Sequence, residues 1–150
     1  VSQRLNADLD LEGTLEAILD GVRALRFSGA RVLLLGPREE APQLAAQLGL
    51  GASAGLATGL TGWIARHHSP LQIDDLRTPP PELGELGELG ALSVAGSPAR
   101  AFLGAPLRLG EDLIGTLELF SARPGAFSAG DLRLLTILAG QAAQAITNAN

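Results

Sequence analysis

The stretch Ala101–Ser121, AFLGAPLRLGEDLIGTLELFS, decides how the rest of the chain can fold. Apolar residues alternate with other residues on both sides of Gly110–Asp112, whose residue types are poor strand formers. The pattern therefore predicts two antiparallel strands joined by a tight connection. If that connection has three residues, Leu109 lies opposite Leu113 and the remaining pairs follow from there.

In this register nearly all the aliphatic side chains of the two strands share one face, as a half-buried antiparallel pair requires. That face is expected to be the wall of a core. The other face is expected to be the floor of a cavity, because it mixes aromatic, small and charged residues: Phe102, Gly104, Pro106, Arg108, Ile114, Thr116, Glu118 and Phe120.

Composition limits the kinds of protein this chain can be. With 150 residues, 46% hydrophobic and 18% charged, it suits one folded domain. A net charge of −5 without a basic stripe disfavours nucleic acid as a partner. No window of about 18 apolar residues predicts a membrane span, and no signal peptide is visible. The sequence has no cysteine, which excludes disulfides and thiol catalysis, and a cytoplasmic location is expected.

The amino-terminal region is expected to be helical. Residues 1–9 have the spacing of an incoming linker helix, and the domain itself is assigned to residues 10–150. Asp8 or Asp10 is expected to cap a second helix that runs from Leu11 to about Arg26. Because the chain lacks methionine and starts within a helical pattern, it is expected to be a fragment of a longer protein.

The middle of the chain predicts three short strands and a helix. Arg31–Gly36 is apolar around its centre and is expected to be a central strand. Gln43–Leu50 fits a strand or a helix, and its flanking proline and glycine favour an edge strand. A helix is expected from about Thr61, followed by a strand over Leu71–Asp75.

Glu82–Gly90 is three copies of Glu-Leu-Gly. A three-residue period spreads the leucines around a helix, and each glycine costs about 1 kcal/mol there. We expect a weak helix or a mobile lid that, within Thr61–Pro98, covers the cavity.

The last helix is expected to begin at Ser128, with Asp131 completing an approximate capping box. Nothing from Leu134 to Asn150 carries a charge. One apolar seam recurs every three or four residues and is the candidate interface of a homodimer; its members are Leu132, Leu135, Ala139, Ala142 and Ile146. A second stripe lies beside it: Leu134, Ile137, Leu138, Gln141 and Ala145.

Several short motifs, taken in order, resemble the GAF domain. Each is weak alone, and the ordered set is specific: Gly59–Gly62 (GLTG), Pro70–Asp74 (PLQID), Pro106-Leu107, Ile114–Leu117 (IGTL), Phe127-Ser128 and Ala145–Ala149. The resemblance implies an α+β fold of the GAF/PAS-like kind, with a central antiparallel sheet of five to six strands. The first and last helices would pack on one face, and short helices and loops would form a pocket on the other.

The resemblance also implies a role. Such domains are sensory modules upstream of histidine kinases, cyclases and transcription regulators, and they pair through their terminal helices; an output domain would then follow Asn150. Without cysteine, a covalently attached bilin and methionine sulfoxide reductase activity are excluded. The residue signature of cyclic-nucleotide-binding members is not found. No cofactor is identified, and the expected ligand is an unidentified small molecule.

The candidate pocket residues are Trp63, Ile73, Asp74, Phe102, Arg108, Thr116, Glu118 and Phe120. A carboxylate in a central strand is expensive to bury unless it is paired. Glu118 is therefore expected to pair with Arg108, to contact a ligand or to face solvent. Asp74 could accept a bond from a ligand or cap the next turn, and Trp63 could plug the core or stack on a ligand.

Three functions remain open. The first is a non-enzymatic sensory module that binds a small molecule and relays through its terminal helices. The second is a dimerisation or spacer module whose collapsed pocket is filled by Phe102, Phe120 and Trp63. The third is a metal enzyme using His67, His68 and Asp74, although neighbouring histidines on a helix point about 100° apart and are more simply explained as exposed residues.

Overall fold

The computed structural model describes residues 2–25, 27–35, 43–49, 57–76 and 100–149. These ranges contain helices and strands in the following order: α1 (Ser2–Gly21), the short 3₁₀ turn η1 (Val22–Ala24), β1 (Gly29–Leu34), β2 (Gln43–Gly49), α2 (Ala57–His67), β3 (Leu71–Ile73), β4 (Ala101–Leu109), β5 (Asp112–Ser121) and α4 (Ala129–Ala149). The predicted repeat lid at Glu82–Gly90 lies outside the described residues.

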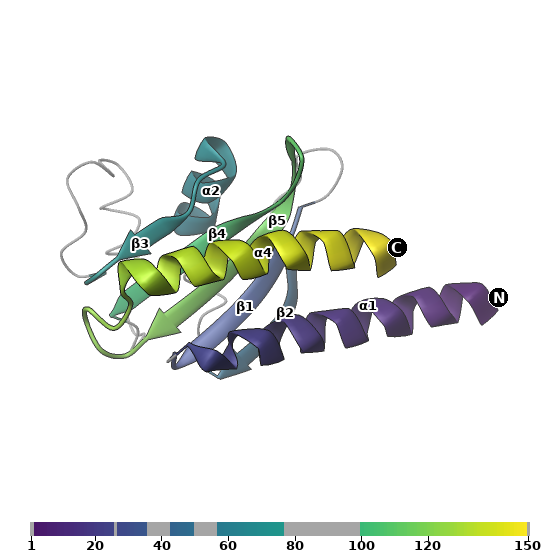
Figure 1. Ribbon diagram of the computed structural model, residues 1–150, viewed down its shortest axis with the longest axis horizontal. Helices are drawn as coiled ribbons and strands as arrows, with labels where there is room; N and C mark the ends of the chain where they lie inside the picture. Colours follow the sequence, from purple (N-terminus) through teal and green to yellow (C-terminus); the bar gives the residue numbers. More distant parts are fainter. Residues whose placement is uncertain (1, 26, 36–42, 50–56, 77–99, 150) are drawn as a thin grey trace.

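The strands form one five-stranded sheet in the order β2-β1-β5-β4-β3, and every neighbouring pair is antiparallel. α1 and α4 lie side by side across one face of this sheet, and α2 lies against the other (Figure 1). We call these the helix face and the α2 face. The arrangement confirms the α+β class and the placement of the first and last helices on one face.

The hairpin of β4 and β5 follows the predicted register along most of its length. Leu103 lies opposite Leu119 and Ala105 opposite Leu117. These four side chains are fully buried on the helix face. The alternation of residue types in the two strands therefore predicted correctly which side chains enter the main core.

At its tip, the hairpin differs from the prediction. Leu109 lies opposite Asp112, not Leu113, and the register shifts beside Arg108. The connection is shorter because Gly110, with a φ of 66°, takes the left-handed conformation required at the first central position of a two-residue turn. The bulge absorbs the residue that the shorter turn leaves over.

The helix face carries the larger core. Apart from Phe127 it consists of aliphatic side chains from α1, η1, three strands and α4: Leu15, Leu19, Val22, Leu25, Ala30, Val32, Ala101, Leu103, Ala105, Leu107, Leu117, Leu119, Phe127, Leu135, Ala139, Ala142, Ala143 and Ile146. Long helices with continuous apolar stripes can cover a sheet in this way without any specific polar contact.

The ends of the terminal helices were predicted with unequal success. α1 runs without a break from Ser2 to Gly21, so Asp8 and Asp10 lie inside it and not at the start of a second helix. α4 begins as predicted: the Ser128 N–H donates to Asp131 Oδ2 at 2.9 Å, and the Asp131 N–H donates to Ser128 Oγ at 3.1 Å. This reciprocal pair is a capping box. No helix in the described ranges has the length and apolar character needed to cross a bilayer.

Strands form where the sequence predicted them, but several begin or end at other residues than predicted. β1 begins at Gly29 and lies between β2 and β5, so it is central. β2 is an edge strand, which resolves the ambiguity of its sequence. β3 is shorter than predicted and ends at Ile73.

Candidate functional site

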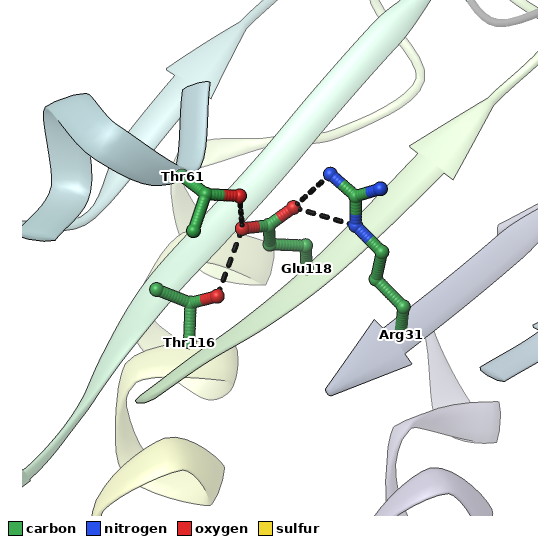
Figure 2. A network of polar contacts seen from close by, with 4 residues as sticks. All are labelled: Arg31, Thr61, Thr116 and Glu118. Carbon is green, nitrogen blue, oxygen red and sulfur yellow. Dashed lines mark hydrogen bonds and ion pairs between the residues drawn. The ribbon is translucent and has the colours of Figure 1, made fainter. Parts of the chain in front are cut away.

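The α2 face contains a group of polar side chains removed from solvent. Arg31, Thr61, Thr116 and Glu118 are each 0% exposed. They come from β1, α2 and β5 and converge beneath α2 (Figure 2). We call these four residues the buried polar network. Burying two opposite charges in this way is tolerated only when each one is paired and hydrogen-bonded.

Glu118 is at the centre of the network. Its Oε1 accepts hydrogen bonds from Arg31 Nε at 2.8 Å and Nη2 at 2.6 Å. Its Oε2 accepts from Thr61 Oγ1 at 2.6 Å and Thr116 Oγ1 at 2.9 Å. A carboxylate offers about four acceptor positions, so these donors saturate it. The network is internally complete with respect to this carboxylate.

Strand register explains why these residues meet. Arg31 and Glu118 are directly opposite each other in the β1–β5 ladder, which puts both side chains on one face. Thr116 precedes Glu118 by two residues in β5 and therefore points the same way. Thr61 reaches the carboxylate from α2, on the side of that helix that also buries Leu60.

An apolar cluster surrounds the network on the same face. Phe102 and Phe120 meet edge to face with ring centroids 5.3 Å apart, and the Arg31 guanidinium carbon lies 4.8 Å from the centre of the Phe120 ring. The cluster comprises Leu60, Ile64, Leu71, Ile73, Leu76, Phe102 and Phe120, each at most 7% exposed. The α2 face is therefore a second, smaller core with a charged pair set into it.

The predicted partner of Glu118 was wrong. Arg108 is exposed near the hairpin tip, where its guanidinium donates to the carbonyl oxygens of His68 at 3.3 Å and Gly110 at 3.5 Å. The actual partner, Arg31, lies in the neighbouring strand β1. Alternation along β4 and β5 identified the face of Glu118, but it carried no information about which strand pairs with β5 on its other side.

Five of the eight predicted pocket residues gather beneath α2: Ile73, Phe102, Thr116, Glu118 and Phe120. Trp63 lies at the margin of the cluster, half-buried, and stacks on His67 with ring centroids 4.1 Å apart. Asp74 and Arg108 are exposed. The eight predicted pocket residues therefore fall into three groups: five that are buried together, one tryptophan at the margin of the cluster, and two at the surface.

The histidines occupy the end of α2. Both are exposed, His67 Nδ1 is 2.8 Å from the Trp63 carbonyl oxygen, and His68 ends the helix with a φ of 52°. Within the described part of the chain, no three histidine, aspartate or glutamate side chains are grouped as metal ligands.

A second ion pair was not anticipated. Arg100 Nε donates to Asp75 Oδ1 at 3.0 Å and Nη2 to Oδ2 at 2.8 Å, while the Leu76 N–H donates to the Arg100 carbonyl oxygen. These hydrogen bonds to Asp75 raise the pKa of Arg100 further above its ordinary value. This bidentate contact holds the start of β4 to the chain that follows β3.

The candidate dimer residues are covered within the chain. Leu135, Ala139, Ala142 and Ile146 are at most 3% exposed in the main core, and Leu132 packs against it. Their expected assignment to a dimer interface is corrected by this placement, since α4 turns this seam toward its own sheet. Periodicity identified an apolar face without showing what covers it.

The second stripe of α4 is the one left at the surface. Leu134 is 38% exposed and Ile137 is 59% exposed. Beside them a shallow groove runs between the two terminal helices, and its lining includes Ile18, Leu138 and Ala145. Exposed apolar side chains next to an apolar groove are typical of a surface that contacts another protein.

Solved structures support the same fold. A GAF domain from Synechocystis in its photoproduct state matches with a TM-score of 0.73 at 20% identity, over 93% of this chain and 94% of that chain. The GAF domain of an Acinetobacter phosphoenolpyruvate-protein phosphotransferase matches with a TM-score of 0.72 at 19% identity, over 98% and 91%. A type II free methionine-R-sulfoxide reductase from Thermoplasma acidophilum matches with a TM-score of 0.72 at 16% identity, over 95% of each chain.

These likenesses show a shared fold, and the third shows that the fold also occurs in an enzyme. The sequence provides the more specific assignment, because the pattern of the family described as "GAF domain" matches residues 8–147. That match includes most of each terminal helix and all five described strands of the sheet. The chain therefore belongs to the GAF domain family.

Proposed function

We propose that this chain is a non-enzymatic sensory GAF domain of a cytoplasmic signal-transduction protein of the histidine kinase, cyclase or transcription regulator type. It binds a small molecule on the α2 face of the sheet. Binding changes how α1 and α4 pack in a homodimer, and this change passes to an output domain beyond Asn150. Membership of a family that is generally regulatory supports this role.

The observation that carries the proposal is the buried polar network. It joins α2 to β5 and β1, whose opposite face packs against α1 and α4. A shift of α2 would disturb Thr61 first and then the Glu118–Arg31 pair, which spans the two central strands. Coupling of this kind needs an element with two arrangements that a ligand can bias, and α2 is our candidate for that element.

A regulatory rather than catalytic role is supported by the sequence. The chain has no cysteine, so thiol-based reduction of a sulfoxide has no nucleophile here. Among the residues that the structure describes, the buried titratable side chains are Arg31 and Glu118, and the carboxylate is fully engaged by its four donors. A saturated carboxylate is suited to holding structure and poorly suited to moving protons.

The test is a search for the ligand. Native mass spectrometry of the purified chain, combined with a thermal shift screen of metabolites, is expected to identify a compound that raises Tm. Hydrogen exchange should then show added protection in α2 and β5. A Gly104→Ala variant, which crowds Ile64 on the α2 face, should weaken that compound's effect, whereas Gly140→Ala on α4 should not.

The alternative is a dimerisation and spacer module with a filled α2 face. One observation favours it: a Cβ at Gly104 would lie 2.6 Å from Ile64 Cδ1 and 2.7 Å from Phe102 Cζ, so this part of the face is tightly packed. If no compound shifts Tm and the α2 amides are already as protected as those of β5, the alternative replaces the sensory proposal.

A further inference from the structure

We propose that the Thr61 hydroxyl is an exchangeable hydrogen-bond donor. A ligand takes its place by donating the hydrogen of its own hydroxyl or amide group to Glu118 Oε2. This inference rests on the proposed function, which places a small molecule on the α2 face. It goes further in naming the atom that recognises the ligand, the chemical class of ligand and the side chain that responds.

The two oxygens of Glu118 are held differently. Oε1 receives two charge-assisted bonds from the Arg31 guanidinium, at 2.8 and 2.6 Å. Oε2 receives two bonds from neutral hydroxyls, those of Thr61 and Thr116 (Figure 2). The guanidinium adds the attraction of opposite charges to its two bonds, and a hydroxyl has no charge of its own, so the exchangeable partners are on Oε2.

Of these two hydroxyls, we take that of Thr61 as the one that leaves, because a helical threonine has an alternative acceptor in the carbonyl oxygen four residues earlier and a strand threonine has none. Thr116 is in β5, where it is paired with Leu33 of β1 on one side and Pro106 of β4 on the other. Thr61 is in α2, and in the described part of the chain no backbone hydrogen bond joins this helix to a strand. The Thr61 hydroxyl is therefore the donor that can be replaced at lowest cost.

The Thr61 hydroxyl also has a second acceptor within reach. Helical threonines commonly donate to the carbonyl oxygen four residues earlier, and α4 contains two examples. Thr136 Oγ1 donates to the Leu132 carbonyl oxygen at 2.8 Å, and Thr147 Oγ1 to that of Ala143 at 2.9 Å. In α2 the equivalent acceptor for Thr61 is the carbonyl oxygen of Ala57. Rotation about χ1 would carry the hydroxyl from Glu118 to this carbonyl, so it stays bonded in both states.

The charges of the network select the chemical class of the ligand. Arg31 and Glu118 together carry no net charge. A cationic ligand would add an uncompensated charge to a buried site, and an anionic ligand would be repelled by the carboxylate it has to contact. Oε2 needs a donor, and the side chains of the buried cluster described on this face are aliphatic and aromatic. The ligand class is a neutral molecule with an apolar body and one hydroxyl or amide N–H.

Benzyl alcohol and toluene form a matched pair of probes, because they share an aromatic ring and only the alcohol can donate. Their dissociation constants are measured by ¹H–¹⁵N NMR titration of the 150-residue chain. Four proteins are compared: the wild type and the variants Thr61→Val, Thr61→Ser and Thr136→Val. Thr61→Val removes the competing hydroxyl and Thr61→Ser keeps it. Thr136→Val is the control that removes a hydroxyl from α4.

We expect benzyl alcohol to bind Thr61→Val about tenfold more tightly than the wild type, because the Thr61 hydroxyl no longer competes with the alcohol for Oε2. Toluene should bind both proteins equally, and Thr61→Ser and Thr136→Val should resemble the wild type. A measurement on the wild type alone covers the case in which Thr61→Val does not fold. Scalar couplings of Thr61 should report a change of χ1 rotamer with benzyl alcohol and none with toluene.

The outcomes separate this inference from the proposed function. Two results would overturn the exchange but leave the proposal that ligands bind the α2 face. In the first, both probes bind this face and Thr61→Val raises their affinities equally. In the second, the Thr61 rotamer does not change when benzyl alcohol binds. If neither probe shifts any α2 or β5 resonance in any of the four proteins, both the exchange and the proposed ligand face are overturned for neutral aromatic ligands.

Discussion

The two faces of β4 and β5 use adjacent residues of the same strands for different kinds of packing. Leu119 points toward α1 and α4 and lies in a core that is aliphatic apart from one phenylalanine. Its neighbours Glu118 and Phe120 point toward α2, where a charged pair is set among aromatic and aliphatic side chains. Both faces are equally buried along these strands, so the difference between them is one of chemistry and not of exposure.

This difference implies different tolerances. Apolar burial is non-directional, so a helix on the helix face can shift by a fraction of a turn and retain most of its stabilisation. A buried charge pair requires particular donors at particular distances, and it penalises any arrangement that leaves one partner alone. The α2 face is therefore where a small displacement has the largest energetic consequence, which is the property a sensory site needs.

Breaking the charged pair is expected to have the largest effect on folding. Arg31→Met or Glu118→Leu alone should lower the free energy of unfolding by about 3–5 kcal/mol, because each leaves an uncompensated buried charge. The double variant Arg31→Met/Glu118→Leu should recover most of that loss. Urea denaturation of the four proteins provides the double-mutant cycle. Single variants that each cost under about 1 kcal/mol would show that the pair is solvated and that the two faces do not differ as argued.

The matched change on the helix face should cost slightly less. Leu119→Ala removes a fully buried side chain from the main core and is expected to cost about 3 kcal/mol, within the usual range for such truncations. No polar substitution of a neighbour should rescue it, because the loss is one of apolar burial and only an apolar side chain can fill the cavity. Leu103→Phe is expected to restore part of the lost free energy of unfolding by filling the cavity. Full recovery of that free energy by a polar substitution at a neighbouring position would contradict an apolar helix face.

Crowding the α2 face without changing its charge is expected to have a smaller effect. Gly104→Ala places a Cβ 2.6 Å from Ile64 Cδ1 and 2.7 Å from Phe102 Cζ, so these side chains must shift to relieve the contact. We expect a loss of about 1–3 kcal/mol in thermal or urea unfolding, typical of overpacking. Gly140→Ala is the control, since a Cβ there meets nothing within 4 Å. It should stabilise α4 by up to about 1 kcal/mol. Equal effects at both glycines would mean that α2 does not pack on β4 as described.

Much of the fold could be predicted because local patterns determine it. Alternation in β4 and β5 assigns Leu103 and Leu119 to one face and Phe120 to the other, since side chains alternate in any strand. The capping box fixes the start of α4 from Ser128 and Asp131 alone. In both cases the deciding contact is between residues close in sequence or joined by one short turn.

The parts that could not be predicted depend on distant partners. Glu118 was recognised as a carboxylate in need of a partner, but its partner Arg31 is 87 residues away, across a strand order that no local pattern reveals. The signal that could have found it was the arginine at the start of an otherwise apolar strand, because a buried strand rarely carries an unpaired charge. Likewise, the seam of α4 was identified correctly as apolar, but periodicity does not distinguish an internal core from a dimer interface.

The smallest effect on folding is expected on the outer side of α4, whose exposed side chains we now propose as the homodimer surface in place of the buried seam. Ile137 is 59% exposed, so Ile137→Glu should change the free energy of unfolding of the monomer by no more than about 0.5 kcal/mol. It should still weaken dimerisation by about a hundredfold or more in sedimentation equilibrium, since each copy would bring an unpaired carboxylate into an apolar contact.

Thr136→Glu is the control for this prediction, because it adds the same charge to an exposed position of α4. Thr136 does not belong to the second stripe, which contains Leu134 and Ile137. It should leave both stability and association unchanged. A wild-type chain that sediments as a monomer at high micromolar concentration would remove the predicted homodimer of the isolated domain. An Ile137→Glu dimer as strong as the wild type would move the interface away from this stripe. Either result would confine the relay to the α2 face and the sheet, since the inner seam of α4 is already occupied by its own core.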